Sequence, residues 1–571
     1  MDKNFFLRPE EAWQRRYEAL RASFVERLPA HVVAERFGFK TSYVHLLRHQ
    51  FRKGLLHLDE QPAPGKTTRR RVARQTREKV CQGRERGLSA GDIAEWLEGE
   101  GVELSVRTVE RVLCEEGFAK LPRRTQLKMG VTRQGALVPQ KAHRIEVGEG
   151  AGPSIECEHA GVFLLLPWIA QLGLLDVVDR SQLPGTKAIP SWSYFLSFLG
   201  LKLLGNERLS HVGVHSFDAG MGLFAGLNVL PKCTALSTYS YRLDALQLSR
   251  FQETFYQACR RLRLYAEDVI NLDFHTVPHY GNESVLETHW AGAKGKALKG
   301  ALTLFAQDAS SKLVLYTEAD LKRNEADDAV LDFVAFYRKM RRALPGTLVF
   351  DSRFTTYENL AELDRLHCRF ITLRRRGAQL IEQANALTDW KRIHVPHAQR
   401  KYPNPLVHES YETLKNYPKP IRQVIIKGNG REQPTFLISN DRKRPVELLV
   451  GDYSRRWRVE NGIAEAVKFF HLNALSSPIL TKVHFDVLLT VVADTLYYLL
   501  AQKLRGFEDC DAPRIFRHFI EGKATVQLTD AQLLVTFPRR AHNPILRNVP
   551  WHRLPNTLPW LQDRKLTFTF L

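Results

Sequence analysis

A phenol, a guanidinium and a carboxylate lie close together in one segment of this 571-residue chain. Tyr453, Arg456 and Glu460 follow one another at intervals of three and four residues, so on a single α-helix they would share one face. Arginine binds phosphate oxygens through its planar fork, the tyrosine hydroxyl can donate to them, and a glutamate can hold a divalent metal. The spacing predicts a helix that presents a phosphate- and metal-binding face.

Two aspartates lie in segments that are expected to be buried strands. Asp273 lies in the apolar run 269–274, and Asp351 closes the run 346–351. An unpaired carboxylate in such a setting is costly. Two divalent ions held by carboxylates from different elements can align and neutralise a phosphoryl transfer. With Glu460, these aspartates predict a metal-dependent site of that kind.

Each of these residues also has a plainer interpretation. An aspartate at a strand end is often a turn former or a helix cap, and Glu460 could simply pair with Arg456. Glu465 is the alternative to Glu460, but it lies about 140° around the helix. His275 shares a strand face with Asp273 and is expected to be a neighbour or a phosphate contact instead of a metal ligand.

The order of these motifs resembles a known family. Residues 453–460 read YSRRWRVE and resemble the signature of cut-and-paste insertion-sequence transposases of the DDE class, which are RNase H-like nucleases with two aspartates and one glutamate. Residues 273–278 and 349–354 resemble the two aspartate motifs. In that family a lysine follows the glutamate by seven residues, whereas this chain has Val467 there and Lys468 next. The resemblance covers roughly residues 266 to 475.

The resemblance implies specific roles. Asp273, Asp351 and Glu460 would be the catalytic residues and would hold two Mg²⁺ ions, for which Mn²⁺ could substitute. Tyr453 and Arg456 would position phosphate near the cleaved end, with Arg353 and Lys468 as weaker candidates. Trp390 could receive a flipped base, and Trp457 is expected in the core. The DNA partners would be the element's terminal inverted repeats and a target, and two DNA ends imply at least two protomers.

The charge and composition of the chain limit the classes of partner that it is expected to bind. The chain carries 83 lysines and arginines and a net charge of +21, which favours double-stranded DNA first and an anionic membrane second. No basic amphipathic helix with an aromatic face supports membrane binding. The apolar run 483–500 contains Asp486 and Asp494, so a core helix explains it better than a membrane span.

Cysteine usage and the first residues suggest a compartment. The seven cysteines are scattered and none forms a C-x-x-C pair, which disfavours structural zinc and fits a reducing environment. The first residues, MDKN, do not read as a signal peptide. We expect a prokaryotic cytoplasmic protein that associates with the nucleoid.

Two helix-turn-helix modules are predicted at the N-terminal side. In residues 1–58, a helix over 30–37, a turn at Gly38 and a second helix capped by Thr41 or Ser42 would expose Tyr43 and Arg48. Residues 76–118 repeat the plan. There Ser89 would cap one helix and Ser105 a second, from which Arg107 and Arg111 would face outward. Such helices read base edges in the major groove.

Basic linkers separate these modules from each other and from the rest. Residues 59–75 contain Arg69, Arg70 and Arg71, which could follow a minor groove or belong to a solvated flexible segment. The second linker, 119–149, is cationic without acidic residues from Ala119 to His143 and would gain most beside phosphates.

The remaining chain predicts a multidomain α plus α/β protein. A helical connector (150–265) precedes an RNase H-like catalytic domain (266–505) with a β-rich insertion (376–450) and a C-terminal region (506–571). Three antiparallel strands, a helix, a strand, a helix and a strand give the RNase H-like order. We keep two alternatives open: an RNase H-like nuclease or resolvase without strand transfer, and a domesticated, non-catalytic DNA-binding protein.

Overall fold

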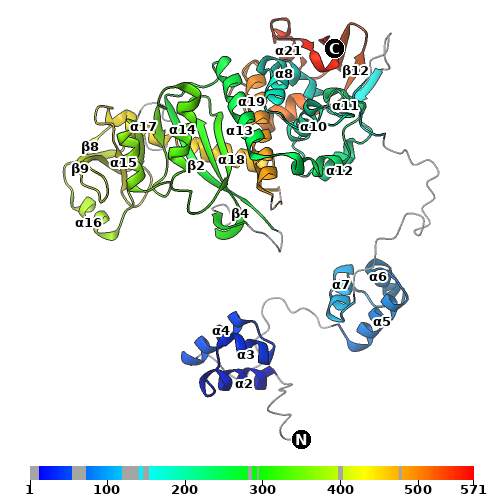
Figure 1. Cartoon of the computed structure of the whole chain (residues 1–571), viewed down its shortest axis with the longest axis vertical. Coiled ribbons are helices and arrows are strands. Elements are labelled where there is room, and N and C mark those ends of the chain that lie inside the picture. The colour runs from blue at the N-terminus through cyan, green and yellow to red at the C-terminus, as the bar shows by residue number, and fades with distance from the viewer. Residues whose placement is uncertain are drawn as a thin grey trace. The chain divides into compact units, whose positions relative to one another are not determined.

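The computed structural model describes residues 12–54, 72–118, 140–145, 154–280, 286–291, 295–395, 403–474, 477 and 479–571. The chain divides into two compact units, Met1–Ala136 and Leu137–Leu571. Mixed helices and sheets build the second unit, and helices build the described part of the first (Figure 1). The expectation of a multidomain mixed α/β protein is confirmed at this level.

The first group of helices in unit 1 is α2 (Ala12–Phe24), α3 (Ala30–Phe37) and α4 (Thr41–Arg52). Buried Val33, Phe37 and Val44 form its small core. Gly38 ends α3 in the left-handed region at φ 66°, where glycine carries no steric penalty. The predicted cap of α4 is wrong: its N-cap is Lys40, which makes no side-chain cap hydrogen bond.

The second group is α5 (Arg74–Glu85), α6 (Ala90–Gly99) and α7 (Val106–Glu115). Both predicted caps are confirmed. Ser89 accepts a hydrogen bond from the Asp92 N–H in a capping box, and Ser105 accepts one from the Thr108 N–H. These caps satisfy backbone donors that the first helical turn leaves unpaired.

Unit 2 contains a large mixed sheet, with ten strands among the described residues. β2 (Val269–Pro278) is antiparallel to β4 (Lys296–Asp308) and parallel to β6 (Thr347–Val349). β6 is parallel to β7 (Phe370–Leu373), while β3 (Thr288–Ala291) and β5 (Val314–Leu321) both pair with β4. β2, β4, β5, α14 (Ala329–Arg341), β6, α15 (Tyr357–Arg365) and β7 come in the order that the sequence predicts, whereas β3 was not predicted.

The two faces of this sheet differ because side chains alternate along a strand. Ile270 and Leu272 of β2 join a buried core with Phe333 of α14 and Leu360 of α15. Asp273 lies on the opposite face, which α18 (Trp457–Lys468) covers. The apolar face thus holds the strand in place while the other face carries the polar residues.

The predicted insertion continues the same sheet. It comprises α16 (Ala378–Ala386), β8 (Lys391–Arg392), β9 (Leu406–Glu412), β10 (Ile421–Lys427) and β11 (Thr435–Ser439). Because β11 pairs antiparallel with β7, its strands extend the catalytic sheet outward. The sequence did not predict α16 or this pairing.

The helices before the sheet and the last residues of the chain share one core. The helices are α8 (Leu166–Leu172), α9 (Leu174–Arg180), α10 (Ser191–Leu203), α11 (Ala219–Phe224), α12 (Cys233–Ser237) and α13 (Ala245–Arg261). A second sheet has the order β1-β12-β13-β15-β14. Its strands are β1 (Ser154–Cys157), β12 (Ala524–Leu528), β13 (Gln532–Phe537), β14 (Thr557–Leu558) and β15 (Arg564–Phe570).

α19 (Leu480–Ala501) passes through this shared core and also packs on β5. The helix is long and apolar enough to cross a membrane, but 78% of its most apolar window is buried within the protein. Lys202 of α10 reaches its Asp486 at 2.8 Å. This burial fits the core helix predicted from the sequence.

Candidate active site

Asp273 projects from β2 beneath α18. One carboxylate oxygen, Oδ1, accepts a hydrogen bond from the Phe274 N–H at 2.9 Å, and the side chain is 22% exposed. Burial raises the pKa of Asp273 to about 6 against the opposing effect of Arg456, and the negative charges of Glu460 and Asp351 add to the rise. The four side chains therefore share one electrostatic site.

Asp351 reaches this site because of the strand register. β2 and β6 run parallel with Asn271 opposite Val349, so continuing that register places Asp351 beside Asp273. The Asp351 Oδ1 accepts hydrogen bonds from the Ser352 N–H at 2.5 Å and from the Ser352 hydroxyl at 3.2 Å. These bonds orient the carboxyl at the end of the strand.

Arg456 lies between two of the predicted catalytic acids. Its Nη1 is 3.5 Å from Asp273 Oδ2, and its Nη2 donates to Glu460 Oε1 at 2.5 Å. The Arg456 side chain is 12% exposed, whereas Glu460 is 50% exposed. Burial acts to lower the pKa of Arg456, but Tyr453 and the surrounding carboxylates outweigh it and raise that pKa above its usual value.

The expected single helix for residues 453–460 is wrong. Tyr453 lies in the last turn of α17 (Val446–Ser454), whereas Arg456 is the N-cap of the next helix, α18. At the junction the Arg455 N–H donates to the Asp452 carbonyl and the Arg456 N–H to the Tyr453 carbonyl, three residues back in each case. This tighter turn still brings the Arg456 guanidinium to 5.9 Å from the Tyr453 ring centre.

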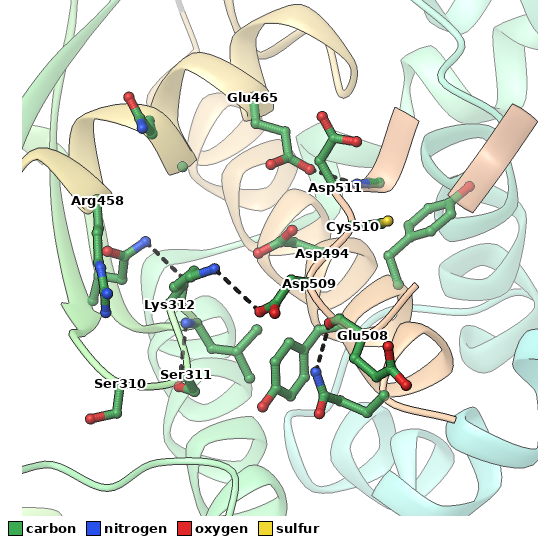
Figure 2. Close-up of a pocket in the computed structure, with 18 of the residues that line it drawn as sticks. Ser310, Ser311, Lys312, Arg458, Glu465, Asp494, Glu508, Asp509, Cys510 and Asp511 are labelled. Atoms are coloured by element: carbon green, nitrogen blue, oxygen red, sulfur yellow. Dashed lines mark hydrogen bonds and ion pairs between the residues drawn. The ribbon is translucent and has the colours of Figure 1, made fainter. Parts of the chain in front are cut away.

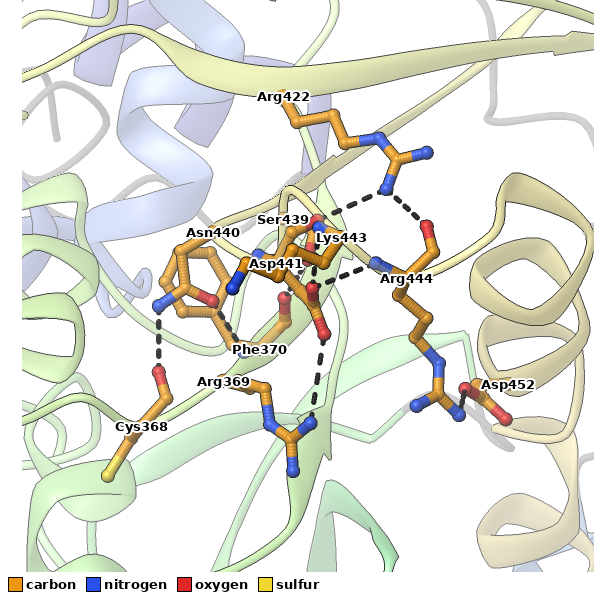
Figure 3. A network of polar contacts seen from close by, with 10 residues as sticks. All are labelled: Cys368, Arg369, Phe370, Arg422, Ser439, Asn440, Asp441, Lys443, Arg444 and Asp452. Carbon is orange, nitrogen blue, oxygen red and sulfur yellow. Dashed lines mark hydrogen bonds and ion pairs between the residues drawn. The ribbon is translucent and has the colours of Figure 1, made fainter.

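Ion pairs and hydrogen bonds fix both sides of the junction. Arg444, in the loop after β11, forms an ion pair with the buried Asp452 of α17. Arg422 of β10 donates to the Asp441 and Arg444 carbonyls and so holds that loop (Figure 3). On the other side, Arg458 donates to the Ala309 carbonyl at 2.7 Å. The inserted strands and the β4–β5 turn therefore position the helix that carries Glu460.

The donor set suits a hard divalent cation, since all three predicted ligands are carboxylates. Burial of Asp273 among other acids also leaves negative charge that a cation would neutralise. In the part of the chain that the structure describes, however, no three His, Cys, Asp or Glu side chains are close enough together to hold a metal ion. The Arg456 guanidinium lies between Asp273 and Glu460 and contacts both.

Comparison with known proteins gives one family match for the segment that carries this site. Residues 265–496 match the family model described as the transposase DDE domain. This match makes residues 265–496 a segment similar to the DDE transposases. No curated protein matches the chain. A solved structure of the piggyBac transposase synaptic complex with hairpin DNA is similar at 10% identity and a TM-score of 0.38, covering 73% of this chain and 87% of that one.

Other predicted residues of the DDE domain differ in their exposure and partners. Arg353 and Lys468 are exposed, while Val467 is partly buried and packs against a cluster of apolar residues. His275 contacts the Asn473 side chain at 2.7 Å, and burial lowers its pKa. No signal in the sequence pointed to Asn473 as its partner.

The sequence also led to predictions for three further residues of the DDE domain, Glu465, Trp457 and Trp390. Glu465, the alternative to Glu460, faces another region, where it accepts a hydrogen bond from the Ala512 N–H at 2.8 Å. Trp457 was expected in the core; this is wrong, because α18 leaves it 53% exposed. The Trp390 indole donates to the Leu387 carbonyl, and Lys427 lies over its ring.

The residues of unit 1 that were predicted to contact DNA differ in their exposure and in their contacts within the protein. Tyr43 and Arg107 are exposed. Arg48 was expected at the surface but is partly buried and donates to the Leu28 carbonyl at 2.7 Å. Arg111 lies 3.7 Å from Glu115 one helical turn away. Arg69, Arg70 and Arg71 lie outside the described residues.

Asp452 and Arg444 were missed by sequence reasoning. Asp452 directly precedes Tyr453, but one acidic residue beside a motif is no signal by itself. Arg444 lies in a loop rich in charged residues (DRKR at 441–444), where nothing distinguishes it from its neighbours. Only the fold shows that these two side chains pair.

Proposed function

We propose that the protein is a DNA transposase that cuts and rejoins the ends of an insertion sequence through an RNase H-like core. The observation that carries the proposal is the grouping of Asp273, Asp351 and Glu460 around the Arg456 guanidinium. This group lies inside a segment that matches the transposase DDE domain. Cutting and joining DNA are both phosphoryl transfers, which carboxylates and a guanidinium suit.

The catalytic step assigns a role to each side chain. Domains of this family generally use divalent metal ions, and two Mg²⁺ ions held by Asp273, Asp351 and Glu460, with Mn²⁺ as a substitute, would neutralise the charge of the transferring phosphate. Asp273 is held within β2, and Asp351, two residues after β6, is held by its hydrogen bonds with Ser352, so these two would supply the fixed half of the site. Glu460 is half exposed and joins them once it releases Arg456.

Arg456 then becomes available for the DNA. Its guanidinium can bind a phosphate oxygen through two parallel hydrogen bonds, and the Tyr453 hydroxyl stays protonated because burial raises its pKa to about 12. A neutral phenol can donate to the same phosphate. Arg353 and Lys468, both exposed, would contact the DNA backbone farther from the reacting atoms.

The two helix groups of unit 1 would provide DNA recognition as helix-turn-helix modules. α4 and α7 are the second helices of their pairs, and their exposed Tyr43 and Arg107 would reach base edges of the terminal inverted repeats. Arg69, Arg70 and Arg71 between the modules would add minor-groove contacts. Because an element has two ends, at least two protomers would assemble on the DNA.

The decisive experiment is cleavage of a labelled duplex that carries the element's own terminal repeat, with Mg²⁺ or Mn²⁺. Metal-dependent cutting at the repeat boundary that Asp273→Ala abolishes is expected, together with products joined to a target. Cutting without joined products would instead identify a nuclease or resolvase. Repeat binding without cutting under either metal would overturn the catalytic assignment and favour a non-catalytic DNA-binding protein.

A further inference from the structure

A pocket of about 490 Å³ lies against α18 on a different side from Glu460. Glu460 and Glu465 differ by five positions, or about 140° around the helix, and Glu465 lines the pocket together with Asp494 of α19 (Figure 2). The turn between β4 and β5 and residues 508–512 complete the wall. Nothing in the proposed catalytic reaction uses this space.

The pocket is acidic although the whole chain is strongly basic. Its lining includes five carboxylates, at Glu465, Asp494, Glu508, Asp509 and Asp511, and two cationic side chains, Lys312 and Arg458. Arg458 already donates to the Ala309 carbonyl. Lys312 lies 3.9 Å from Asp509, which is a loose contact. Burial raises the pKa of Asp494 to about 8, so this carboxyl is mostly neutral near neutral pH. The other four carboxylates still outnumber the two cations, and a phosphate or DNA strand would be repelled.

The floor of the pocket is formed by Glu465, Asp494 and Gln307, and of these Glu465 already accepts a hydrogen bond from the Ala512 N–H. Burial raises the pKa of both Asp494 and Glu465 above the ordinary carboxyl value, and for Asp494 the charge of Glu465 adds to the rise. Gln307 is 1% exposed, and its amide donates to the Lys312 carbonyl. Its own carbonyl oxygen, Oε1, has no hydrogen-bond partner among the described residues, and such a buried acceptor is costly.

The carboxylates lie at two depths. Glu465 and Asp494 are partly buried, whereas Glu508, Asp509 and Asp511 are exposed at the rim, and the Asp509 side chain is 97% exposed. In the described residues, no three acidic side chains converge closely enough to hold a metal ion. The volume also exceeds the roughly 30 Å³ of one water many times over. An extended cation with separated charges fits this arrangement better than a single ion.

We propose that this pocket binds a linear polyamine, an alkyl chain that carries two or more ammonium groups. One ammonium would donate to Glu465, Asp494 and the Gln307 carbonyl at the floor, and another would meet Asp509 at the rim. Trp457 and Tyr498 also line the pocket and can cover methylene groups and contact ammonium charge. Since Trp457 and Glu465 belong to the helix that carries Glu460, occupancy would stabilise that helix.

The test titrates spermidine into the full-length protein without DNA, near neutral pH and at moderate salt, by calorimetry and thermal unfolding. One saturable site per chain is expected, with tighter binding than ethylamine and a raised unfolding temperature. Asp494→Asn and Glu465→Gln should each weaken spermidine binding about tenfold. Asp509→Asn should weaken spermidine while leaving ethylamine nearly unchanged, and because Asp509 is exposed the variant should fold.

Controls separate a built site from diffuse charge attraction. Glu158→Gln removes an exposed acid that lies outside the pocket and pairs with Lys523, so it should bind spermidine like the unaltered chain. Equal weakening in Glu158→Gln, the absence of saturation, or equally tight binding of ethylamine would overturn the proposal. Complete competition by Mg²⁺ at equal concentration would also overturn it, in favour of a simple ion site.

Discussion

Asp273 carries an unfavourable charge in the metal-free protein. Its carboxyl is largely buried beside two other acids, and the single bridging cation, Arg456, does not offset the burial, because the pKa remains raised to about 6. An active site often keeps such locally destabilising groups because its reaction requires them. The cost should be measurable in the stability of the protein.

The first prediction concerns the dependence of that stability on pH. An acid whose pKa is higher in the folded than in the unfolded state binds more protons when folded, so stability falls as pH rises from about 4 to about 6. Asp273→Asn cannot lose a proton and should be more stable than the unaltered chain above pH 6, by up to about 3 kcal/mol. Urea unfolding without divalent metal, at pH values across this window, measures the difference. An unchanged pH profile would contradict the raised pKa.

A second prediction concerns Arg456 and its neighbour Arg455. Arg456→Ala should reduce cleavage of the terminal-repeat duplex at least about tenfold, since a phosphate contact and the bridge to Glu460 are both lost. Arg456→Lys should recover only part, because an ammonium lacks the planar fork. Single-turnover cleavage with Mg²⁺ is the measurement.

Arg455→Ala is the matched control for this pair of variants. It removes an adjacent positive charge that lies 4.0 Å from Asp452 and outside the carboxylate site. Its cleavage rate should stay close to that of the unaltered chain. Equal losses in Arg455→Ala and Arg456→Ala would show that general charge, and not the bridging position, matters.

At the scale of elements, local patterns predicted more than long-range pairings. The apolar run around Asp273 was correctly interpreted as a strand, and Ser89 and Ser105 as caps, because these signals lie within a few residues. The strand expected over 346–351 is shorter: β6 ends at Val349 and leaves Asp351 outside it. The continuous helix expected over 453–460 was wrong, since it is divided between α17 and α18. The contact of Arg458 with Ala309 beside this junction joins residues about 150 positions apart, which no local pattern reports. The pairing of β11 with β7 was missed for the same reason.

The junction of α17 and α18 yields a third prediction. Arg444→Met removes the cation that pairs with the buried Asp452 and should destabilise the protein by about 2 kcal/mol, since a buried charge is left uncompensated. The double variant Arg444→Met with Asp452→Asn should regain part of this loss. Urea unfolding of the four proteins in this cycle gives the coupling energy, and a value near zero would contradict a stabilising pair.

At the scale of the whole molecule, charge is unevenly distributed. The net charge of +21 should give an affinity for any DNA that falls steeply with salt, as counterion release requires. Charge alone does not select a sequence, because phosphate contacts carry no base information. Selection of the terminal repeats must come from side chains at base edges, for which the helices of unit 1 are the proposed source.

Removal of unit 1 tests whether its helices supply the recognition of the terminal repeats. A chain that begins at residue 137 keeps the second compact unit with its own core and should unfold cooperatively. It should bind terminal-repeat and scrambled duplexes equally, whereas the full chain should prefer the repeat by at least about tenfold at physiological salt. Competition binding with both duplexes measures the ratio. A truncated chain that still prefers the repeat would place recognition in unit 2, and Arg107→Ala in the full chain would then leave the preference unchanged.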